Sequence, residues 1–402
     1  MDVSLSEEIA ERASLPLDRI GSLFAVMILS ALVFLPYLLM RMSRIAQAEP
    51  VQIGAAFGPG SIKGWALAAA FAALAVVLAL KGPVSRRLLA SVAGIVLVAL
   101  TLGWAAGGLL PPDNRFARVS VGGGAWLLFA AFALSTGDAL VRLRLGPGAR
   151  LLVLALALGA LAALLLSGTW ANLSIMKEYA GRADAFAREF KTHLFLAVGS
   201  LLAACVIGLP LGIFCARNRT LRDALLPVLS IIQTIPSMAL FGLLIAPLAW
   251  IAAHLPGASA LGIAGIGPAP AFIALLAYSL LPIVSSTLAG LAGLPADVLD
   301  AADGMGMTPR QKLWGVELPL SLPAILTGVR IVLVQNIGMT VIAGLVGGGG
   351  LGVFVFQGIS QTATDLVLLG ALPTVVMAFA AAIVLDALIE FSRKSRKKGR
   401  SS

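Results

Sequence analysis

Apolar residues occur in ten long runs along the chain, and short polar connections separate these runs. A run of about 20 apolar residues matches the thickness of a bilayer crossed by an α-helix, so each run predicts a transmembrane helix. The fourth run is interrupted by the glycines at 122–124. We expect the helices at residues 20–40, 64–80, 88–110, 119–140, 151–168, 192–216, 224–251, 269–292, 321–346 and 365–391.

Composition supports the same class of protein. Hydrophobic residues make up 59% of the 402 residues and charged residues only 12%. A soluble fold must cover its surface with polar groups, and this chain has too few of them. The fold class is therefore an all-α polytopic membrane protein with about ten transmembrane helices.

The net charge of +10 comes from short connections and from the basic segment 393–400. Such clusters typically face anionic lipid head groups, so we expect membrane lipid as a contact. No aromatic residue is interleaved with the basic segment, and we expect no nucleic-acid partner.

The distribution of Lys and Arg predicts the orientation of the second half. Basic residues lie in the connections 217–223 and 293–320 and in the C-terminal tail, whereas 252–268 and 347–364 carry none. This predicts a cytoplasmic C-terminus and a cytoplasmic 293–320 connection. In the first half, basic residues fall almost equally on both sides and do not decide its orientation.

The segment 169–193 mixes charges of both signs and is too polar to span a membrane. We expect an external amphipathic helix and linker there, and we place the domain boundary at this point. The prediction is an N-terminal extension of about five spans at 1–190, a second domain at 191–392, and a basic cytoplasmic tail at 393–402.

The connection between the eighth and ninth spans has the signals of two short helices. Pro295 favours a helix start, and Gly304 and Gly306 favour its end. Thr308 and Gln311 form a capping-box pattern that predicts a second helix start. Asp300 and Asp303 flank the small pair 301–302, which suits close approach of a partner. The alternative is a loop resting on lipid head groups, and acidic residues fit anionic lipid poorly.

These residues resemble a known family motif. Permease subunits of binding-protein-dependent ABC importers carry Glu-Ala-Ala, three residues, Gly, nine residues, Ile, one residue and Leu-Pro. This chain differs in having Asp300 for Glu and Val316 for Ile. The resemblance covers roughly residues 190–392 and implies a five-helix type I ABC importer permease core. It also implies that the loop docks on an ATPase through Asp300, Ala301, Ala302, Gly306, Pro309, Val316, Leu318 and Pro319.

A narrower resemblance concerns the solute. The segments 301–331, 335–359 and 365–373 are similar to permeases for osmoprotectants, which are quaternary amines such as glycine betaine, choline and carnitine. The N-terminal spans resemble one branch of that subfamily. The implied function is osmoprotectant translocation across the bacterial inner membrane. The alternatives are a permease for another small solute, such as an amino acid, and an ion-coupled secondary transporter.

The resemblance also implies the partners. We expect separate ABC ATPase subunits that bind the ATP, an extracytoplasmic solute-binding protein, and a second copy or a sister permease. We expect no cofactor in this chain and no enzymatic activity, because no catalytic constellation lies within the spans. The glycines at 347–350 lack the Gly-Lys-Ser/Thr ending of a phosphate loop, and we interpret them as a flexible external turn.

Polar residues within spans are candidates for the translocation path. Helix–helix hydrogen bonding is the competing explanation. Prolines inside the sixth and seventh spans either line a cavity or mark packing irregularity. His193 and His254 are far apart, and no metal site is expected. The path candidates are Gln233, Thr234, Ser285, Ser286, Gln335 and Asn336.

Overall fold

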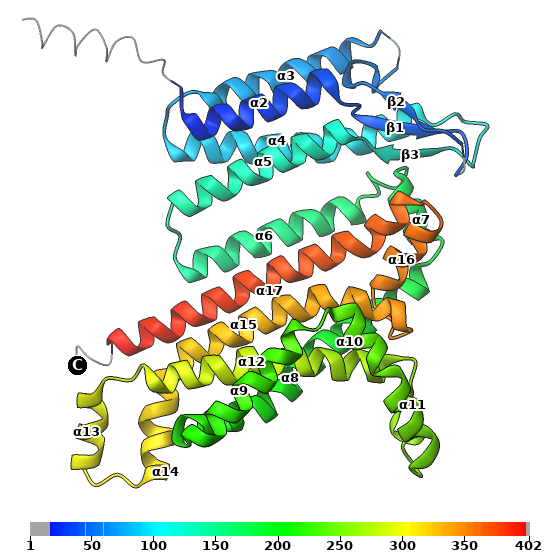
Figure 1. Cartoon of the computed structure of the whole chain (residues 1–402). Helices are drawn as coiled ribbons and strands as arrows, with labels where there is room; N and C mark the ends of the chain where they lie inside the picture. The colour runs from blue at the N-terminus through cyan, green and yellow to red at the C-terminus, as the bar shows by residue number, and fades with distance from the viewer. Residues whose placement is uncertain (1–16, 45, 59, 399–402) are drawn as a thin grey trace, which may run out of the picture. The chain divides into compact units, whose positions relative to one another are not determined.

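The computed structural model describes residues 17–44, 46–58 and 60–398. The chain divides into two compact units (Figure 1). Unit 1 contains the residues up to 146 together with 156–180, and unit 2 contains 147–155 and the residues from 181 onward. Helix α6 (Pro147–Leu166) is therefore divided between the two units.

Unit 1 is built around four helices that pack in a ring. They are α2 (Arg19–Phe34), α3 (Ile62–Ala79), α4 (Val84–Leu109) and α5 (Gly123–Arg142). Contacts join α2 to α3, α3 to α4, α4 to α5 and α5 back to α2. The centre is apolar, with Ile28, Phe71 and Phe132 fully buried. The rings of Phe71 and Phe132 lie 5.9 Å apart between centroids.

A small antiparallel sheet at one end of unit 1 was not expected from the hydropathy pattern. Its strands are β1 (Leu38–Arg41), β2 (Glu49–Val51) and β3 (Arg118–Val121), in the order β2-β1-β3. Leu38 pairs with Val51 on one side and with Val121 on the other. Helix α7 (Ser174–Ala180) contacts β3, and a 3₁₀ turn (Ile53–Ala55) follows β2. Strands of three or four residues are too short to give a period-two signal of their own.

This sheet corrects two of the expected spans. The first, 20–40, ends as a helix at Phe34, because Pro36 has no N–H and disfavours the helical conformation at Leu35. The fourth, 119–140, begins as β3, and its helix starts only at Gly123. A Cβ at Gly122 would lie 2.3 Å from the Pro36 carbonyl oxygen, so the glycines mark the close packing of strand and helix.

Unit 2 is organised around α12 (Pro268–Ala292), which packs against α8, α9 and α15. α17 packs against α15 and α16, and the connection after α12 holds two short helices, α13 and α14. The bounds of the other helices are α8 (Ala183–Arg217), α9 (Arg219–Thr234), α10 (Ser237–Leu243), α11 (Ile245–His254), α13 (Ala296–Gly304), α14 (Pro309–Lys312), α15 (Leu318–Ala343), α16 (Gly352–Ser360) and α17 (Thr364–Lys398). Short 3₁₀ turns occupy Ser259–Leu261 and Gly344–Val346.

Two expectations for this half are wrong. The seventh span, 224–251, is not one helix but α9, α10 and α11, with its first break at Pro236. The polar segment 169–193 was expected to form a separate helix and linker. Its residues 183–193 are instead the first residues of α8. α8 has 35 residues and is roughly 50 Å long, so it exceeds the thickness of a bilayer and can keep its polar end outside.

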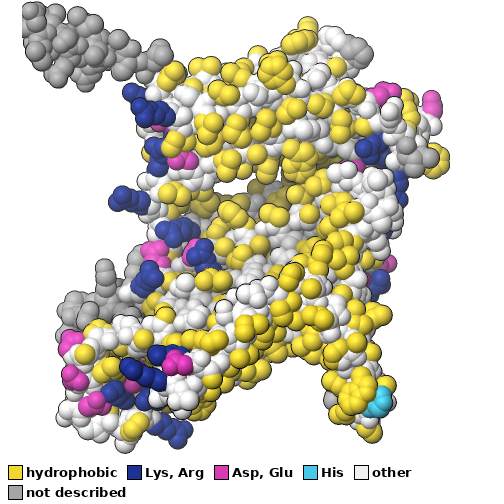
Figure 2. Space-filling model, in the orientation of Figure 1, with side chains coloured by type: hydrophobic (Ala, Val, Ile, Leu, Met, Phe, Trp, Pro, Cys, Tyr) yellow, Lys and Arg dark blue, Asp and Glu magenta, His cyan; other side chains and the backbone are white. Residues whose placement is uncertain are grey.

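Within the described residues, nine helical segments are long and apolar enough to cross a membrane, and α2 is a shorter apolar helix. Figure 2 shows hydrophobic side chains along the lengths of the helices and charged side chains gathered mainly at their ends. One charge inside a span is paired: Arg330 of α15 lies 2.8 Å from Asp386 of α17. Arg150 of α6 also pairs with Glu390 of α17, at 3.4 Å. The basic tail continues α17 to Lys398, and residues 399–402 lie outside the described residues.

Candidate functional site

The loop helix α13 ends in a glycine cap. The N–H of Met307 donates to the Ala302 carbonyl at 3.2 Å, and the N–H of Gly306 donates to the Asp303 carbonyl at 2.9 Å. These two bonds form a Schellman motif, in which Gly306 has a φ of +71°. A residue with a Cβ adopts this conformation only at a steric cost. The prediction that glycines end this helix is confirmed.

The predicted capping box at the start of α14 is also confirmed. The N–H of Gln311 donates to Thr308 Oγ1 at 3.3 Å, and the N–H of Thr308 donates to Gln311 Oε1 at 2.9 Å. Pro309 occupies the first turn, where no backbone N–H is needed. Lys312 Nζ lies 2.7 Å from Asp303 Oδ2 and joins α14 to α13. The two short helices are therefore tied to each other.

The surface of this loop differs in part from the expectation. Asp300 and Ala301 are exposed, but Ala302 is buried at 1% exposure. Successive helical residues point about 100° apart, so only Ala301 of the small pair is open to close approach of a partner. Large apolar side chains are exposed instead, with Met305 at 71% and Trp314 at 66%. The exposed surface thus combines a carboxylate with apolar contacts, which suits docking on a protein partner.

The base of the loop is joined to α8 by an ion pair that the sequence analysis missed. A π-helical turn, Leu313–Glu317, connects α14 to α15 and leaves the motif residues Val316 and Leu318 half-buried and Pro319 exposed. Glu317 is buried, and its Oε2 lies 2.6 Å from Arg217 Nη2 at the end of α8. The signal available in the sequence was an acidic residue inside the motif and an arginine run in the neighbouring connection.

A pocket of about 380 Å³ lies at this base. Its lining brings together Arg217 of α8, Arg222 of α9, Leu299 of α13 and Glu317, with apolar residues from the end of α12. Side chains from α8, α9 and α12 therefore meet α13 at this pocket.

Asn336 of α15 joins three helices inside unit 2. Its Nδ2 donates to Ser200 Oγ of α8 and to Ser279 Oγ of α12, both at 2.9 Å. The side chain is fully buried. In this conformation Asn336 takes part in helix–helix hydrogen bonding, which was the competing explanation for its place in a span.

Gln233 and Thr234 lie at the break between α9 and α10. Gln233 Nε2 donates to the Tyr278 carbonyl at 2.9 Å, and the Tyr278 hydroxyl donates to the Ile235 carbonyl. Thr234 is exposed, and its hydroxyl donates to the Ile231 carbonyl at 2.7 Å. Pro236 lies at this break, and the hydrogen bonds to Tyr278 hold the broken helix against α12.

The three other path candidates do not form one cluster with this break. Ser285 donates to the Pro282 carbonyl at 3.3 Å, within α12. Ser286 lies against Gly328, where an added Cβ would meet its Oγ at 2.5 Å. Gln335 Nε2 contacts Met339 Sδ at 3.4 Å on its own helix. Their place on the path stays a prediction.

The glycine loop after α15 makes hydrogen bonds to α8, and its expected flexibility stays a prediction. Gly350 N–H donates to Glu189 Oε2 at 2.8 Å, and Leu351 N–H donates to His193 Nδ1 at 3.3 Å. His193 Nε2 lies 3.0 Å from the Ile337 carbonyl, which assigns its proton to Nε2. The described residues contain no cluster of three or more metal-ligating side chains.

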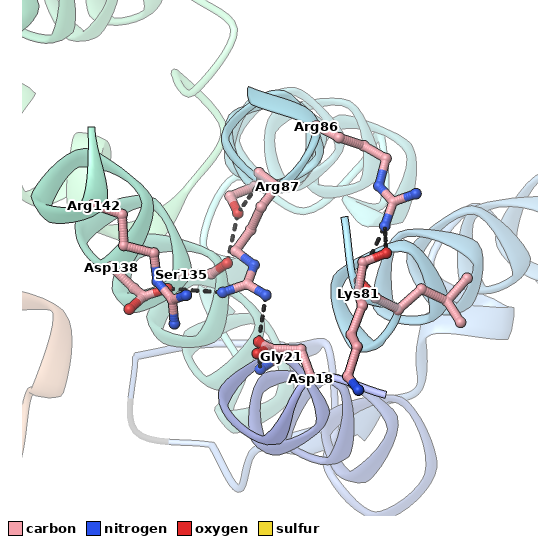
Figure 3. Close-up of polar contacts among 10 residues, drawn as sticks. Asp18, Gly21, Lys81, Arg86, Arg87, Ser135, Asp138 and Arg142 are labelled. Atoms are coloured by element: carbon pink, nitrogen blue, oxygen red, sulfur yellow. Dashed lines mark hydrogen bonds and ion pairs between the residues drawn. The ribbon is translucent and has the colours of Figure 1, made fainter. Parts of the chain in front are cut away.

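Unit 1 contains an ion network around the buried Arg87 (Figure 3). Arg87 of α4 points between Asp18, which caps α2, and Asp138 of α5, and its Nη1 lies 2.9 Å from Asp138 Oδ2. Arg142 reaches the same Asp138 oxygen at 2.9 Å. Burial alone favours the neutral form of Asp18, but the Gly21 N–H and the Arg87 guanidinium outweigh it and lower the pKa of this carboxyl below 3.8. The network fixes three helices to one another.

Two family models match the chain. The model described as ABC transporter permease YehY, N-terminal domain, matches residues 18–176. The model described as binding-protein-dependent transport system inner membrane component matches residues 208–398.

Curated relatives match about half of the chain. The osmoprotectant import permease protein OsmW of Salmonella typhimurium is 41% identical over 197 residues, which cover 49% of this chain and 85% of the relative. The glycine betaine/carnitine/choline transport system permease protein OpuCD of Bacillus subtilis is 37% identical over 53% of this chain and 86% of its own length. The choline transport system permease protein OpuBD of the same organism is 35% identical over 56% and 93%.

A solved inward-facing structure of the MetNI methionine ABC transporter contains a chain that is 24% identical, with a TM-score of 0.44, over 52% of this chain and 95% of that chain.

The relatives above are more than 30% identical, and the match extends over most of their length. The chain therefore belongs to the family of binding-protein-dependent transport system inner membrane components.

Proposed function

We propose that this chain is the permease subunit through which an ABC importer carries an osmoprotectant, such as glycine betaine or a related quaternary amine, across the bacterial inner membrane. The observation that carries the proposal is the agreement of the relatives, which are named for osmoprotectant, glycine betaine, carnitine and choline transport. Its family consists of transport components, so the chain is not an enzyme.

The loop that contains α13 and α14 is the coupling element in this proposal. The Schellman turn at Gly306, the capping box and the Lys312–Asp303 pair make the two helices move together. The Arg217–Glu317 pair links the base of the loop to α8, and the π-helical turn leads directly into α15. A movement of an ATPase subunit against Asp300, Ala301 and the exposed apolar residues thus reaches two spans.

The partners follow from the same proposal. ATP is bound by a separate ATPase, and this chain carries no cofactor. A solute-binding protein delivers the amine on the external side, and two permease subunits, either identical or sister chains, enclose the path. The C-terminus and the α13–α14 loop face the cytoplasm, in agreement with the basic residues at 217–223 and in the tail.

The test is to purify the tagged chain in mild detergent from cells that also produce its transport partners, and to identify bound proteins by mass spectrometry. Gly306→Val is compared with Gly304→Val. Both positions have open space for a side chain, but only Gly306 requires a positive φ. We expect wild type and Gly304→Val to retain an ABC ATPase and Gly306→Val to lose most of it.

Uptake of labelled glycine betaine into the same cells tests the solute. Wild type and Gly304→Val should support uptake, and Gly306→Val should lower it at least about tenfold, because most of the ATPase is lost. A folded wild-type chain that binds no ATPase contradicts the importer proposal. Bound ATPase with uptake of an amino acid but of no quaternary amine contradicts the solute class alone.

A further inference from the structure

The break between α9 and α10 lies beside the middle part of α12. Tyr278, which holds the break, is the eleventh of the 25 residues of α12. At 1.5 Å per residue it lies about 15 Å from the start of that helix, which is half of a hydrocarbon thickness of about 30 Å. The break is therefore not a feature of the membrane surface.

Backbone carbonyls are left without donors at this break. Pro236 has no N–H for the Ile232 carbonyl, which accepts the Ile235 N–H at 3.3 Å instead. The Ile235 carbonyl accepts the Tyr278 hydroxyl. In the part of the chain that the structure describes, the carbonyls of Gln233 and Thr234 accept no hydrogen bond.

Lipid is a poor neighbour for such a backbone. Irregular backbone at membrane depth is tolerated where it is buried in protein or lines a water-filled cavity. Thr234 and Pro236 are both exposed in this chain. The face at the break must therefore be covered by another chain or open to water.

The free carbonyls of α9 favour a cation at the break, and the uncapped N–H groups at the start of the seven-residue α10 oppose this with a shorter run of aligned peptides. The C-terminal end of α9 carries partial negative charge from its unsatisfied carbonyl groups, and a cation is stabilised there. A quaternary ammonium has no N–H to donate, so it is held by dipoles and aromatic faces and not by directed hydrogen bonds. Carbonyl oxygens that replace water around such a group lower the cost of moving it through the membrane.

We propose that the α9–α10 break is a contact site on the translocation path for the cationic head group of a quaternary amine. The carbonyls of Gln233 and Thr234 face the cation. Tyr278 and Pro236 keep the break from closing into a continuous helix, and the Gln233 amide fixes its distance from α12. The identity of the solute rests on the proposed function, whereas the exposure of the break to water and its preference for cations do not.

The experiment measures access of charged thiol reagents to the break. Cys205 and Cys215 are replaced by alanine, and Thr234→Cys is compared with Val206→Cys of α8, which is 74% exposed. Each variant is produced with its transport partners in membrane vesicles. The probes are a methanethiosulfonate that carries a trimethylammonium group and one that carries a sulfonate. Both need water to react.

We expect Thr234→Cys to react, and to react about three- to thirtyfold faster with the trimethylammonium reagent than with the sulfonate reagent. Val206→Cys should react with neither. Adding Pro236→Ala allows the helix to continue and should slow the reaction at Thr234→Cys. Pro227→Ala, which replaces the proline inside α9, should leave the reaction unchanged.

Two outcomes overturn the proposal. If Thr234→Cys is as unreactive as Val206→Cys, the break faces lipid or another chain. If both reagents react equally fast, the carbonyls do not favour cations. A cation preference at Thr234→Cys in a chain that takes up no quaternary amine supports the contact site and contradicts the proposed solute.

Discussion

At the scale of single residues, Arg87 is a charged side chain in the apolar part of unit 1. Its side chain is almost fully buried between Asp18 and Asp138. Without Arg87, Asp138 keeps Arg142 as its partner, but Asp18 is left with the Gly21 N–H alone in a poorly solvated place. We expect Arg87→Ala to lower the free energy of unfolding by about 1–3 kcal/mol, measured by denaturant unfolding in detergent.

The control for this prediction is the neighbouring Arg86, which is exposed and donates to the Leu80 and Lys81 carbonyls. Arg86→Ala should change the unfolding free energy by roughly 0.5 kcal/mol or less. Adding Asp18→Asn to Arg87→Ala removes the carboxylate that lost its guanidinium partner and should restore part of the lost stability. A double variant as unstable as Arg87→Ala would show that the loss comes from packing and not from charge.

The sequence predicted which residue types matter in the spans but not which partners they take. Asn336 was singled out as an intramembrane polar residue, and its two serine partners come from helices more than 50 residues away. Hydropathy places a residue at a depth in the membrane and says little about how each helix is rotated. The pairing of Glu317 with Arg217 could not be predicted either, because the rotation of α8 and of the turn before α15 is not given by hydropathy.

At the scale of elements, local chemistry was predictable and long-range packing was not. The end of α13 and the start of α14 follow from glycine and capping preferences within a few residues, and both predictions are confirmed. The glycines at 347–350 predict a flexible turn because they lack the ending of a phosphate loop and lie between two spans. The hydrogen bonds that reach this loop come from Glu189 and His193, about 160 residues earlier in the chain.

This dependence gives a prediction for the glycine loop. Glu189→Ala removes a charge-assisted hydrogen bond to the Gly350 N–H, which is worth about 1.5–3 kcal/mol. Hydrogen exchange at the amides of 347–352, measured by mass spectrometry, should become about 10- to 150-fold faster. Lys191→Ala changes an exposed charge nearby and should leave exchange unaltered. Unchanged exchange in Glu189→Ala would mean that the loop is ordered by its glycine packing alone.

At the scale of the whole molecule, hydropathy was enough to give the fold class and nearly all of the spans. The sheet in unit 1 was missed because its strands are short and their partners are distant in sequence. The family models match two separate stretches, 18–176 and 208–398. The matched regions span 85–93% of the length of the curated relatives but only about half of this chain. A permease core of this family therefore does not require the N-terminal stretch.

A truncated chain tests whether the predicted second domain works without the N-terminal stretch. The truncation is placed at Gly181, before the predicted boundary at 190, so that α8 stays whole. A variant that begins with methionine followed by Gly181 retains all of α8, including Glu189 and His193, and loses unit 1 together with α6. Counting α9 to α11 as one passage, five passages remain, so a cytoplasmic C-terminus requires an external N-terminus. We expect this variant to insert, to bind the ATPase and to support glycine betaine uptake at a measurable rate. The loss of the Arg150–Glu390 pair should cost roughly 1 kcal/mol or less, because both side chains are partly exposed. A variant that inserts and folds but fails to bind the ATPase would show that the N-terminal stretch belongs to the coupling machinery itself.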